Sequence, residues 1–302
     1  MWFKNLHLYQ LSTPFELSPE QLAEKLEEKR FIPCAKMAEE SVGWVSPIHR
    51  SKEYLVHAAG GCILICMRRE QKVIPPSAVK EELEEQVFAI QEELGRKVFS
   101  KEKQSLKEDI VAKMLPRAFT RSTHVFAYID TKNNYLVLNA GSDKVADLIY
   151  ELLIETVGSF GAIKLVGKDN PALVLNSWLE HGLPDGWEFT GDYELKDLQD
   201  DRVAKFKDNE AENAVIGDLL DDGYQVQKIG VRYKGQLKAV IQQDLVVKSV
   251  KFMDELLAEN DDVDGEDELV KFDADFALMT RSLADFIADL ISIFMSEEGT
   301  EE

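Results

Sequence analysis

Eight cationic side chains gather between residues 96 and 121 of an otherwise strongly acidic chain. This basic stretch, RKVFSKEKQSLKEDIVAKMLPRAFTR, has only three acidic residues and a net charge of +5, whereas the whole chain of 302 residues carries −21. Lysine and arginine at such a density can hold phosphate groups, and binding to a polyphosphate gains free energy from the counterions it releases. Because phosphate contacts carry no sequence information, this chemistry needs no base-reading motif.

A helix expected over residues 97–115 would position these cations before the chain reaches Pro116. Apolar residues share one face of that helix, namely Val98, Leu106 and Ile110. Cations spaced seven and four residues apart line up on another face, namely Arg96, Lys103 and Lys107. A further pair, four residues apart, is Lys97 and Lys101. The pattern predicts a basic helix face; the alternative is an ordinary solvated face, the usual place of Lys and Glu.

Chemistry of other kinds finds little support in the sequence. None of the five histidines is four residues from another histidine or a cysteine. There is no Gly-x-Ser-x-Gly turn, no glycine-rich phosphate loop with lysine and no GxGxxG motif. The three cysteines, Cys34, Cys62 and Cys66, lie in apolar surroundings and are expected to be reduced thiols of the core. We therefore predict no enzyme and no cofactor.

Two acidic segments resemble metal sites at first sight. Residues 260–265, Asn-Asp-Asp-Val-Asp-Gly, match the start of an EF-hand loop, but Lys271 stands where that loop needs its bidentate glutamate. A cluster for a metal-dependent nuclease would consist of Glu266, Asp267, Glu268, Asp273 and Asp275. Both lie in a uniformly acidic segment, which favours a solvated helix face. No metal is predicted, and the nuclease stays as an alternative.

The composition is that of a globular protein, with 45% apolar residues. No run of about 18 apolar residues is present to span a membrane. The start MWFKNLHLYQL lacks the features of a signal peptide, so a cytoplasmic location is expected. The net charge of −21 argues against nucleic acid as a partner, but binding depends on the local potential rather than the average.

Hairpin-linked strands and interspersed helices run along the chain. Tight turns are expected at Gly60-Gly61 and Asn133-Asn134. The expected helices include residues 77–95, 143–158, 265–277 and 279–295. Because strands and helices do not alternate regularly, we predict an α+β fold with antiparallel sheets and flanking helices, not a doubly wound fold.

Three regions are expected from this order of elements. Residues 1–75 together with 120–175 would form a central α+β region. Residues 76–119 would form a helical segment that carries most of the basic stretch. Residues 176–302 would form a second α+β region that ends in acidic helices.

Several long strings resemble the bacterial recombination-associated protein family RdgC, in matching order from end to end. They are MWFKNL at the start, GWVSP at 43–47, ICMRREQKVIPP at 65–76, SLKEDIVAKMLPRAFTR at 105–121, VKFMDEL at 250–256 and KFDADFALMT at 271–280. The resemblance implies a nucleoid-associated protein that binds double-stranded DNA without sequence specificity. It further implies an elongated, curved subunit that forms a ring-shaped homodimer with a basic central hole, restrains RecA-mediated recombination and assists replication.

Site residues are carried over from the family only where the strings match. The DNA-binding candidates are Lys4, Arg68, Lys72, Lys97, Lys101, Lys103, Lys107, Arg117, Arg121, Lys248 and Lys251. Phe119, within LPRAF, matches an apolar residue expected at a subunit contact. Single-stranded DNA remains a further candidate ligand. A second hypothesis is an acidic protein–protein regulator that acts on the recombinase directly, motivated by the acidic segment 259–302.

Overall fold

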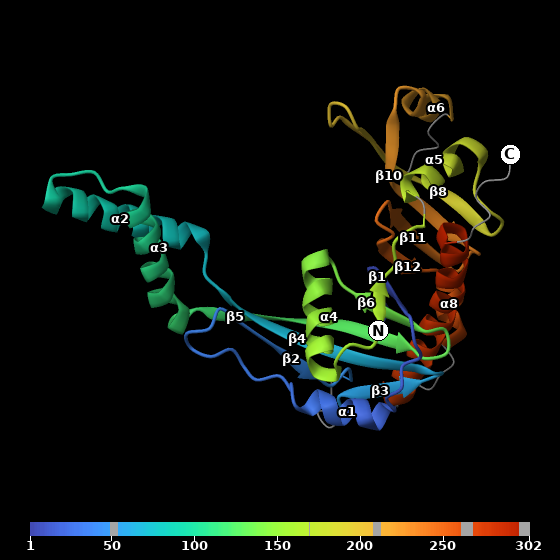
Figure 1. Cartoon of the computed structure of the whole chain (residues 1–302), viewed down its shortest axis with the longest axis horizontal. Helices are drawn as coiled ribbons and strands as arrows, with labels where there is room; N and C mark the ends of the chain where they lie inside the picture. Colours follow the sequence, from blue (N-terminus) through green and yellow to red (C-terminus); the bar gives the residue numbers. More distant parts are fainter. Residues whose placement is uncertain (49–53, 169, 208–212, 261–267, 296–302) are drawn as a thin grey trace.

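The computed structural model describes residues 1–48, 54–168, 170–207, 213–260 and 268–295. Figure 1 shows an open arch: a helical arm rises at one end, a sheet forms the base, and a second strand-rich part rises at the other end. The chain is therefore elongated and curved, with one concave side. Among the described residues, no helix is long and apolar enough to cross a membrane.

The described strands form one 12-stranded sheet in the order β2-β4-β5-β6-β1-β12-β11-β10-β8-β9, with β3 paired to β4 and β7 paired to β1. Every pair of these strands is antiparallel, which confirms the predicted α+β class. The strands are β1 Leu6–Leu11, β2 Glu40–Val45, β3 Val56–Ala59, β4 Cys62–Val73, β5 Phe119–Asp130, β6 Tyr135–Asn139, β7 Ala162–Lys164, β8 Trp187–Asp197, β9 Val203–Phe206, β10 Tyr224–Tyr233, β11 Leu237–Gln242 and β12 Val247–Phe252.

The predicted glycine turn joins β3 to β4. Gly60 and Gly61 both have positive φ, 63° and 89°, which glycine adopts without strain. Ala59 pairs with Cys62 directly behind the turn. At the next hairpin, between β5 and β6, Asn134 has a φ of 60°, so both turn predictions are confirmed.

The helices are α1 Pro19–Glu27, α2 Pro76–Leu94, α3 Ser100–Met114, α4 Asp143–Val157, α5 Pro171–His181, α6 Asn213–Asp221, α7 Asp254–Leu257 and α8 Glu268–Met295, with 3-10 turns at Leu115–Arg117 and Ala258–Asn260. The prediction of two helices at 265–277 and 279–295 was wrong over its described part, because α8 is continuous. Phe276, Leu278 and Met279 are all buried, so the apolar stripe passes through the expected break without glycine or proline to end it.

Alternation along the strands builds a core on each face of the sheet. Cys62 and Leu64 face a core that includes α5, α6 and α8. Ile63 and Ile65 face the other core, which is closed by α1 and α4. On β10, β11 and β12, the buried side chains belong mainly to the first core, so the polar residues and Val240 form the opposite surface. We call that surface the open face.

The arm consists of α2 and α3, which follow the end of β4 and precede β5 (Figure 1). Gly95 ends α2 in a left-handed conformation with φ 64°, and its N–H donates to Gln91 O at 3.0 Å. Helix α2 therefore ends at the boundary expected for the helix over residues 77–95. Val98 and Ile110 are buried in the arm.

Candidate nucleic-acid interface

The first part of the basic stretch is a connection, not a helix. Because α3 begins at Ser100, the predicted alignment of Arg96 with the lysines of one helix face was wrong. Arg96 instead donates two hydrogen bonds to Glu102, at 2.7 and 3.0 Å. These bonds, with a further one from the Phe99 N–H at 2.9 Å, lower the pKa of Glu102 to about 2. Arg96 thus secures the entry into α3.

Four of the predicted DNA-binding lysines lie in the arm and are exposed, namely Lys97, Lys101, Lys103 and Lys107. Within the part of the chain that the structure describes, none of them has an ion-pair partner. Lys103 and Lys107 lie one turn apart on α3, as predicted. Lys101 and Lys103 are separated by about 200° around the helix, and Lys97 precedes it. These four lysines therefore form one pair and two separate charges, not a single basic face.

A second group of predicted residues meets at the junction of the two halves of the sheet. Lys248 and Lys251 lie on β12, and the Val250 N–H donates to Lys4 O at 2.9 Å. Lys238 on β11 joins them, because it pairs directly with Lys251 in the β11–β12 ladder. We call Lys4, Lys238, Lys248 and Lys251 the central lysine cluster.

Sequence reasoning missed Lys238. The available signal was the alternation in LKAVIQ, where Leu237, Ala239 and Ile241 are buried and Lys238 is half-buried on the open face. The pairing of this strand with β12 could not be predicted from the sequence. Among the described residues, Lys4, Lys238 and Lys251 have no carboxylate partner.

The cations farther along the open face lie beside carboxylates, although Lys205 and Lys228 share the single carboxylate of Glu194. Lys228 Nζ contacts Glu194 at 2.9 Å, and Arg232 Nη1 lies 3.3 Å from Glu188 Oε2. The unpaired positive charge of this face is therefore concentrated on β11 and β12, next to β1.

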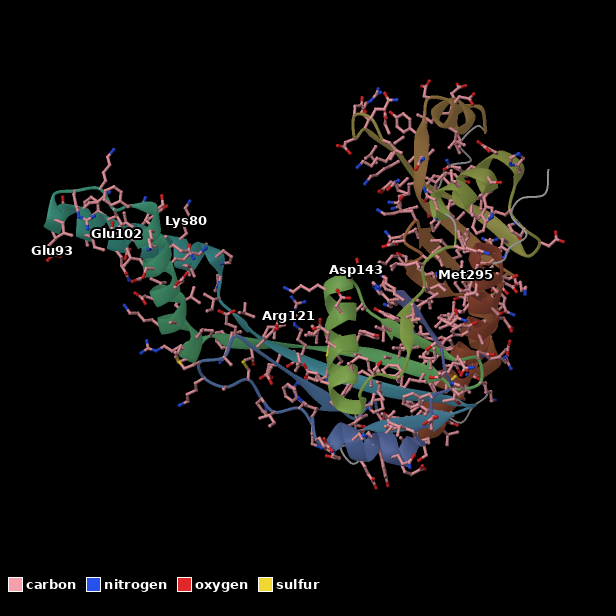
Figure 2. All side chains as sticks on the ribbon, in the orientation of Figure 1. Lys80, Glu93, Glu102, Arg121, Asp143 and Met295 are labelled. Carbon is pink, nitrogen blue, oxygen red and sulfur yellow. The ribbon has the colours of Figure 1, made fainter. Side chains whose placement is uncertain are left out.

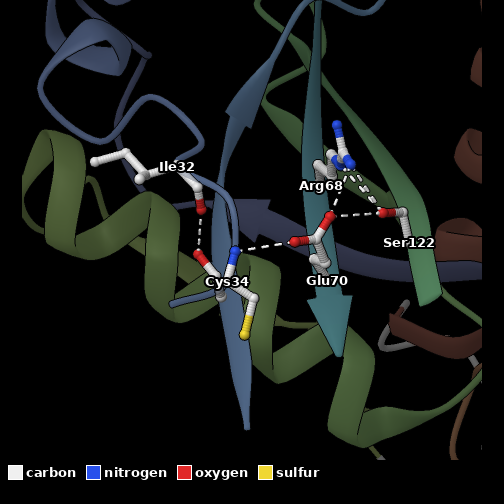
Figure 3. A network of polar contacts seen from close by, with 6 residues as sticks. Ile32, Cys34, Arg68, Glu70 and Ser122 are labelled. Atoms are coloured by element: carbon white, nitrogen blue, oxygen red, sulfur yellow. Dashed lines mark hydrogen bonds and ion pairs between the residues drawn. The ribbon is translucent and has the colours of Figure 1, made fainter. Parts of the chain in front are cut away.

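Arg68 has a different environment from the lysines. Figure 3 shows its guanidinium donating to Glu70 at 2.8 Å and to Ser122, whose hydroxyl also reaches Glu70. The other oxygen of Glu70 accepts from the Cys34 N–H at 2.9 Å, and Arg68 lies 4.4 Å from the centre of the Phe31 ring. This network fastens the loop before β2 to β4 and β5, so the Arg68 charge is already used within the fold.

The remaining predicted cations lie where β4 and β5 meet the arm. Gln71 pairs with Arg121 and Lys72 pairs with Thr120, so Lys72 and Arg121 project from opposite faces of the sheet. Arg121 is exposed and Lys72 is half-buried. Arg117 is exposed in the 3-10 turn. They do not join the central lysine cluster.

Phe119 is the most exposed large apolar side chain described, at 88%. It begins β5 opposite Val73 and borders a pocket of about 550 Å³. The pocket is otherwise lined mainly by apolar groups from the root of the arm, including Ile74, Ile110 and Met114. An exposed aromatic ring beside an apolar pocket is typical of a protein–protein contact.

No group of three or more His, Cys, Asp or Glu side chains is placed to hold a metal ion, within the described ranges. Residues 261–267, which include most of the EF-hand-like loop, Glu266 and Asp267, lie outside those ranges. Of the other acids in the nuclease alternative, Asp273 contacts His57 Nε2 at 3.1 Å and Asp275 accepts from Asn260 Nδ2 at 3.3 Å. Each of these two carboxylates thus has its own partner.

Comparison with known proteins places these features in a family. The family model described as "Putative exonuclease, RdgC" matches residues 1–297. Relatives named recombination-associated protein RdgC come from Aeromonas hydrophila (39% identical, 99% of both chains), Tolumonas auensis (36% identical, 99% of this chain and all of the other) and Haemophilus influenzae (35% identical, 99% of both). The chain therefore belongs to the RdgC family of recombination-associated proteins.

Proposed function

We propose that this chain binds double-stranded DNA without sequence specificity, with the concave side of the arch against the duplex. The observation that carries this proposal is the central lysine cluster, in which Lys238 and Lys251 stand directly opposite each other without an acid between them. Like charges in that position destabilise a sheet. A phosphate backbone supplies the missing negative charge.

The charge distribution supports a binding mode limited to one surface. The chain has a net charge of −21, so most of its exterior repels DNA. Lysines on β11, β12 and the arm supply the positive charges that would contact the phosphates. The contacts are electrostatic, so we expect the affinity to fall steeply with salt and to depend little on base sequence.

In the proposed assembly two chains close a ring around the duplex. The exposed Phe119 and its neighbouring pocket supply one self-complementary contact, as a two-fold interface requires. A duplex enclosed in this way is less accessible to RecA filaments, which accounts for limited recombination. Such a protein acts by occlusion and needs no catalytic group.

The test measures the affinity for a labelled duplex at several salt concentrations, using two triple variants. One reverses Lys4, Lys238 and Lys251 to Glu; the other reverses Lys101, Lys103 and Lys107 to Glu. We expect the first to lose tight binding and the second to weaken it, with circular dichroism spectra unchanged. Wild-type affinity in both triple variants would overturn the proposal. RecA inhibition that persists without DNA binding would favour the acidic protein–protein regulator instead.

The family description as an exonuclease motivates one further candidate. The acids of this alternative are Glu266, Asp267, Glu268, Asp273 and Asp275, of which Glu266 and Asp267 lie outside the described residues. Incubation of linear and circular plasmid with the protein and Mg²⁺ or Mn²⁺ decides this case. Shortened linear DNA would support the nuclease, whereas intact DNA would exclude it under those conditions.

A further inference from the structure

The N-terminus of α4 points into the concave side of the arch. Figure 2 labels Asp143, the first residue of α4, at the end that faces the opening. Ser142 precedes the helix, and its hydroxyl makes no cap hydrogen bond. The Val145 N–H donates to Ser142 O at 3.1 Å, but the N–H groups before it have no intrahelical acceptor and lie at the positive end of the helix dipole. Helix ends of this kind bind phosphate groups.

Three lysines surround this helix end. Lys164 Nζ lies 3.0 Å from Asp143 Oδ1, and Lys248 Nζ donates to a carbonyl of the preceding loop at 3.2 Å. Lys144 is exposed on the first turn. The acids that act on Lys248 are Asp143 and Asp244. With three lysines, two aspartates and a positive helix end, the site attracts anions although the chain as a whole repels them.

Behind Asp143 lies a buried histidine whose ring is only partly satisfied. His7 is 1% exposed, and its Nε2–H donates to Ala140 O at 3.2 Å, so Nδ1 of the neutral ring carries no proton. That Nδ1 has no hydrogen-bond partner and faces Asp143 Oδ1 at 3.6 Å. Burial and the charge of Lys248 lower the pKa of His7. An unsatisfied buried acceptor that faces a carboxylate is unfavourable, and a proton on Nδ1 would turn the same contact into a hydrogen bond.

We propose that the N-terminus of α4 holds one backbone phosphate of the bound duplex, and that His7 takes up a proton from solvent as the phosphate enters. The Nδ1–H then donates to Asp143, which offsets the repulsion between that carboxylate and the phosphate. This inference rests on the proposed function, since the phosphate belongs to duplex DNA. The groups that face His7 are Asp143 on α4, Lys164 on β7 and Lys248 on β12. Because binding raises the pKa of His7, duplex affinity rises as the pH falls through its titration.

The variant Asp143→Asn distinguishes a site that binds phosphate from a cluster that only stabilises the fold. Removal of the carboxylate is expected to tighten duplex binding about threefold, the effect of one charge several ångströms away in water, and to abolish the pH dependence. Lys248→Gln is expected to reduce the slope of log affinity against log salt by about 0.9. Lys271→Gln, an exposed lysine on α8, is the matched control and leaves the slope unchanged.

The ring signals of His7 in NMR spectra of the wild-type chain report on the site without any substitution. We expect added duplex to shift them to the protonated form, and inorganic phosphate to do so only weakly. A shift with inorganic phosphate and none with duplex would assign the site to a free phosphate and overturn the inference. If wild type binds duplex but both variants match it and His7 does not respond, the inference alone is wrong. If wild type does not bind duplex, the proposed function fails as well.

Discussion

Lys238 on β11 and Lys251 on β12 are directly paired across the ladder, two like charges on neighbouring strands. Such a pair lowers the stability of a sheet, so the fold does not explain it. Lys4, whose carbonyl accepts the Val250 N–H beside Lys251, extends the same charge. We infer that the charge of this surface serves to bind a ligand, although it lowers the stability of the sheet.

Lys238→Glu is expected to raise stability while it weakens DNA binding. The new carboxylate would face Lys251, so the free energy of unfolding should increase by about 0.5 kcal/mol. Loss of a phosphate contact should reduce the salt slope by about 0.9. Urea denaturation and duplex titration measure the two effects. Lys271→Glu, with the same charge change on α8, should leave duplex affinity nearly unchanged; equal weakening by both variants would point to net charge alone.

The arm lysines are expected to act as a pair. Lys103 and Lys107 lie one turn apart on α3, so a double reversal to Glu removes two contacts from one side of the helix. The salt slope should then fall by about 1.8. Lys101→Glu, on another side of α3, should have a smaller effect. An equal or larger effect of Lys101→Glu, measured in the same duplex titrations, would show that the helix is turned the other way toward DNA.

Phe119→Ser is expected to weaken self-association without unfolding the subunit. The ring is 88% exposed, so its removal costs little core packing, and the free energy of unfolding of the monomer should change by no more than about 0.5 kcal/mol. Sedimentation velocity over a range of protein concentrations measures the dimer. Phe88→Ser, also an exposed phenylalanine at 63%, is the control and should sediment as wild type does. Unaltered dimerisation in Phe119→Ser would remove that residue from the interface.

The local features of the fold could be predicted from the sequence. Gly60-Gly61 and Asn134 adopt the backbone conformations that their types favour. Ser18 begins α1 with a capping box to Gln21, a pairing of residue types that the sequence shows locally. These predictions succeeded because each depends on neighbours within a few residues.

Long-range pairing could not be predicted in the same way. β1 pairs with β12 across some 240 residues through Leu6 and Val247, and this contact gathers the central lysine cluster from two strands and the N-terminal segment. The prediction that Arg96 lies on a helix face was wrong because α3 begins only at Ser100, and the Arg96 side chain binds Glu102. The expected break in α8 failed because the buried stripe continues through Leu278. For the strand pairing and the continuous α8, tertiary contacts decided between alternatives that the local pattern left open.

Glu70→Gln is expected to destabilise the chain at neutral pH and much less in acid. The Glu70 carboxylate is buried and accepts from the Cys34 N–H, Ser122 and Arg68, and loss of a charged acceptor of this kind costs about 1.5–3 kcal/mol. Its pKa is lowered below the ordinary 4.5, chiefly by the Cys34 N–H. The ionised form therefore stabilises the fold above about pH 4.5, and this contribution is lost as the pH falls through the lowered pKa.

Urea denaturation of wild type and Glu70→Gln between neutral pH and pH 3 measures this difference directly. The gap in unfolding free energy should be widest near neutral pH and should narrow as acid protonates Glu70 in the wild type. Glu40→Gln is the control, since Glu40 is 42% exposed where it pairs with Arg69 on the same strand as Arg68, and an exposed pair contributes about 0–1 kcal/mol. A gap that is constant with pH would mean that the charge of Glu70 does not contribute to the stability of the network.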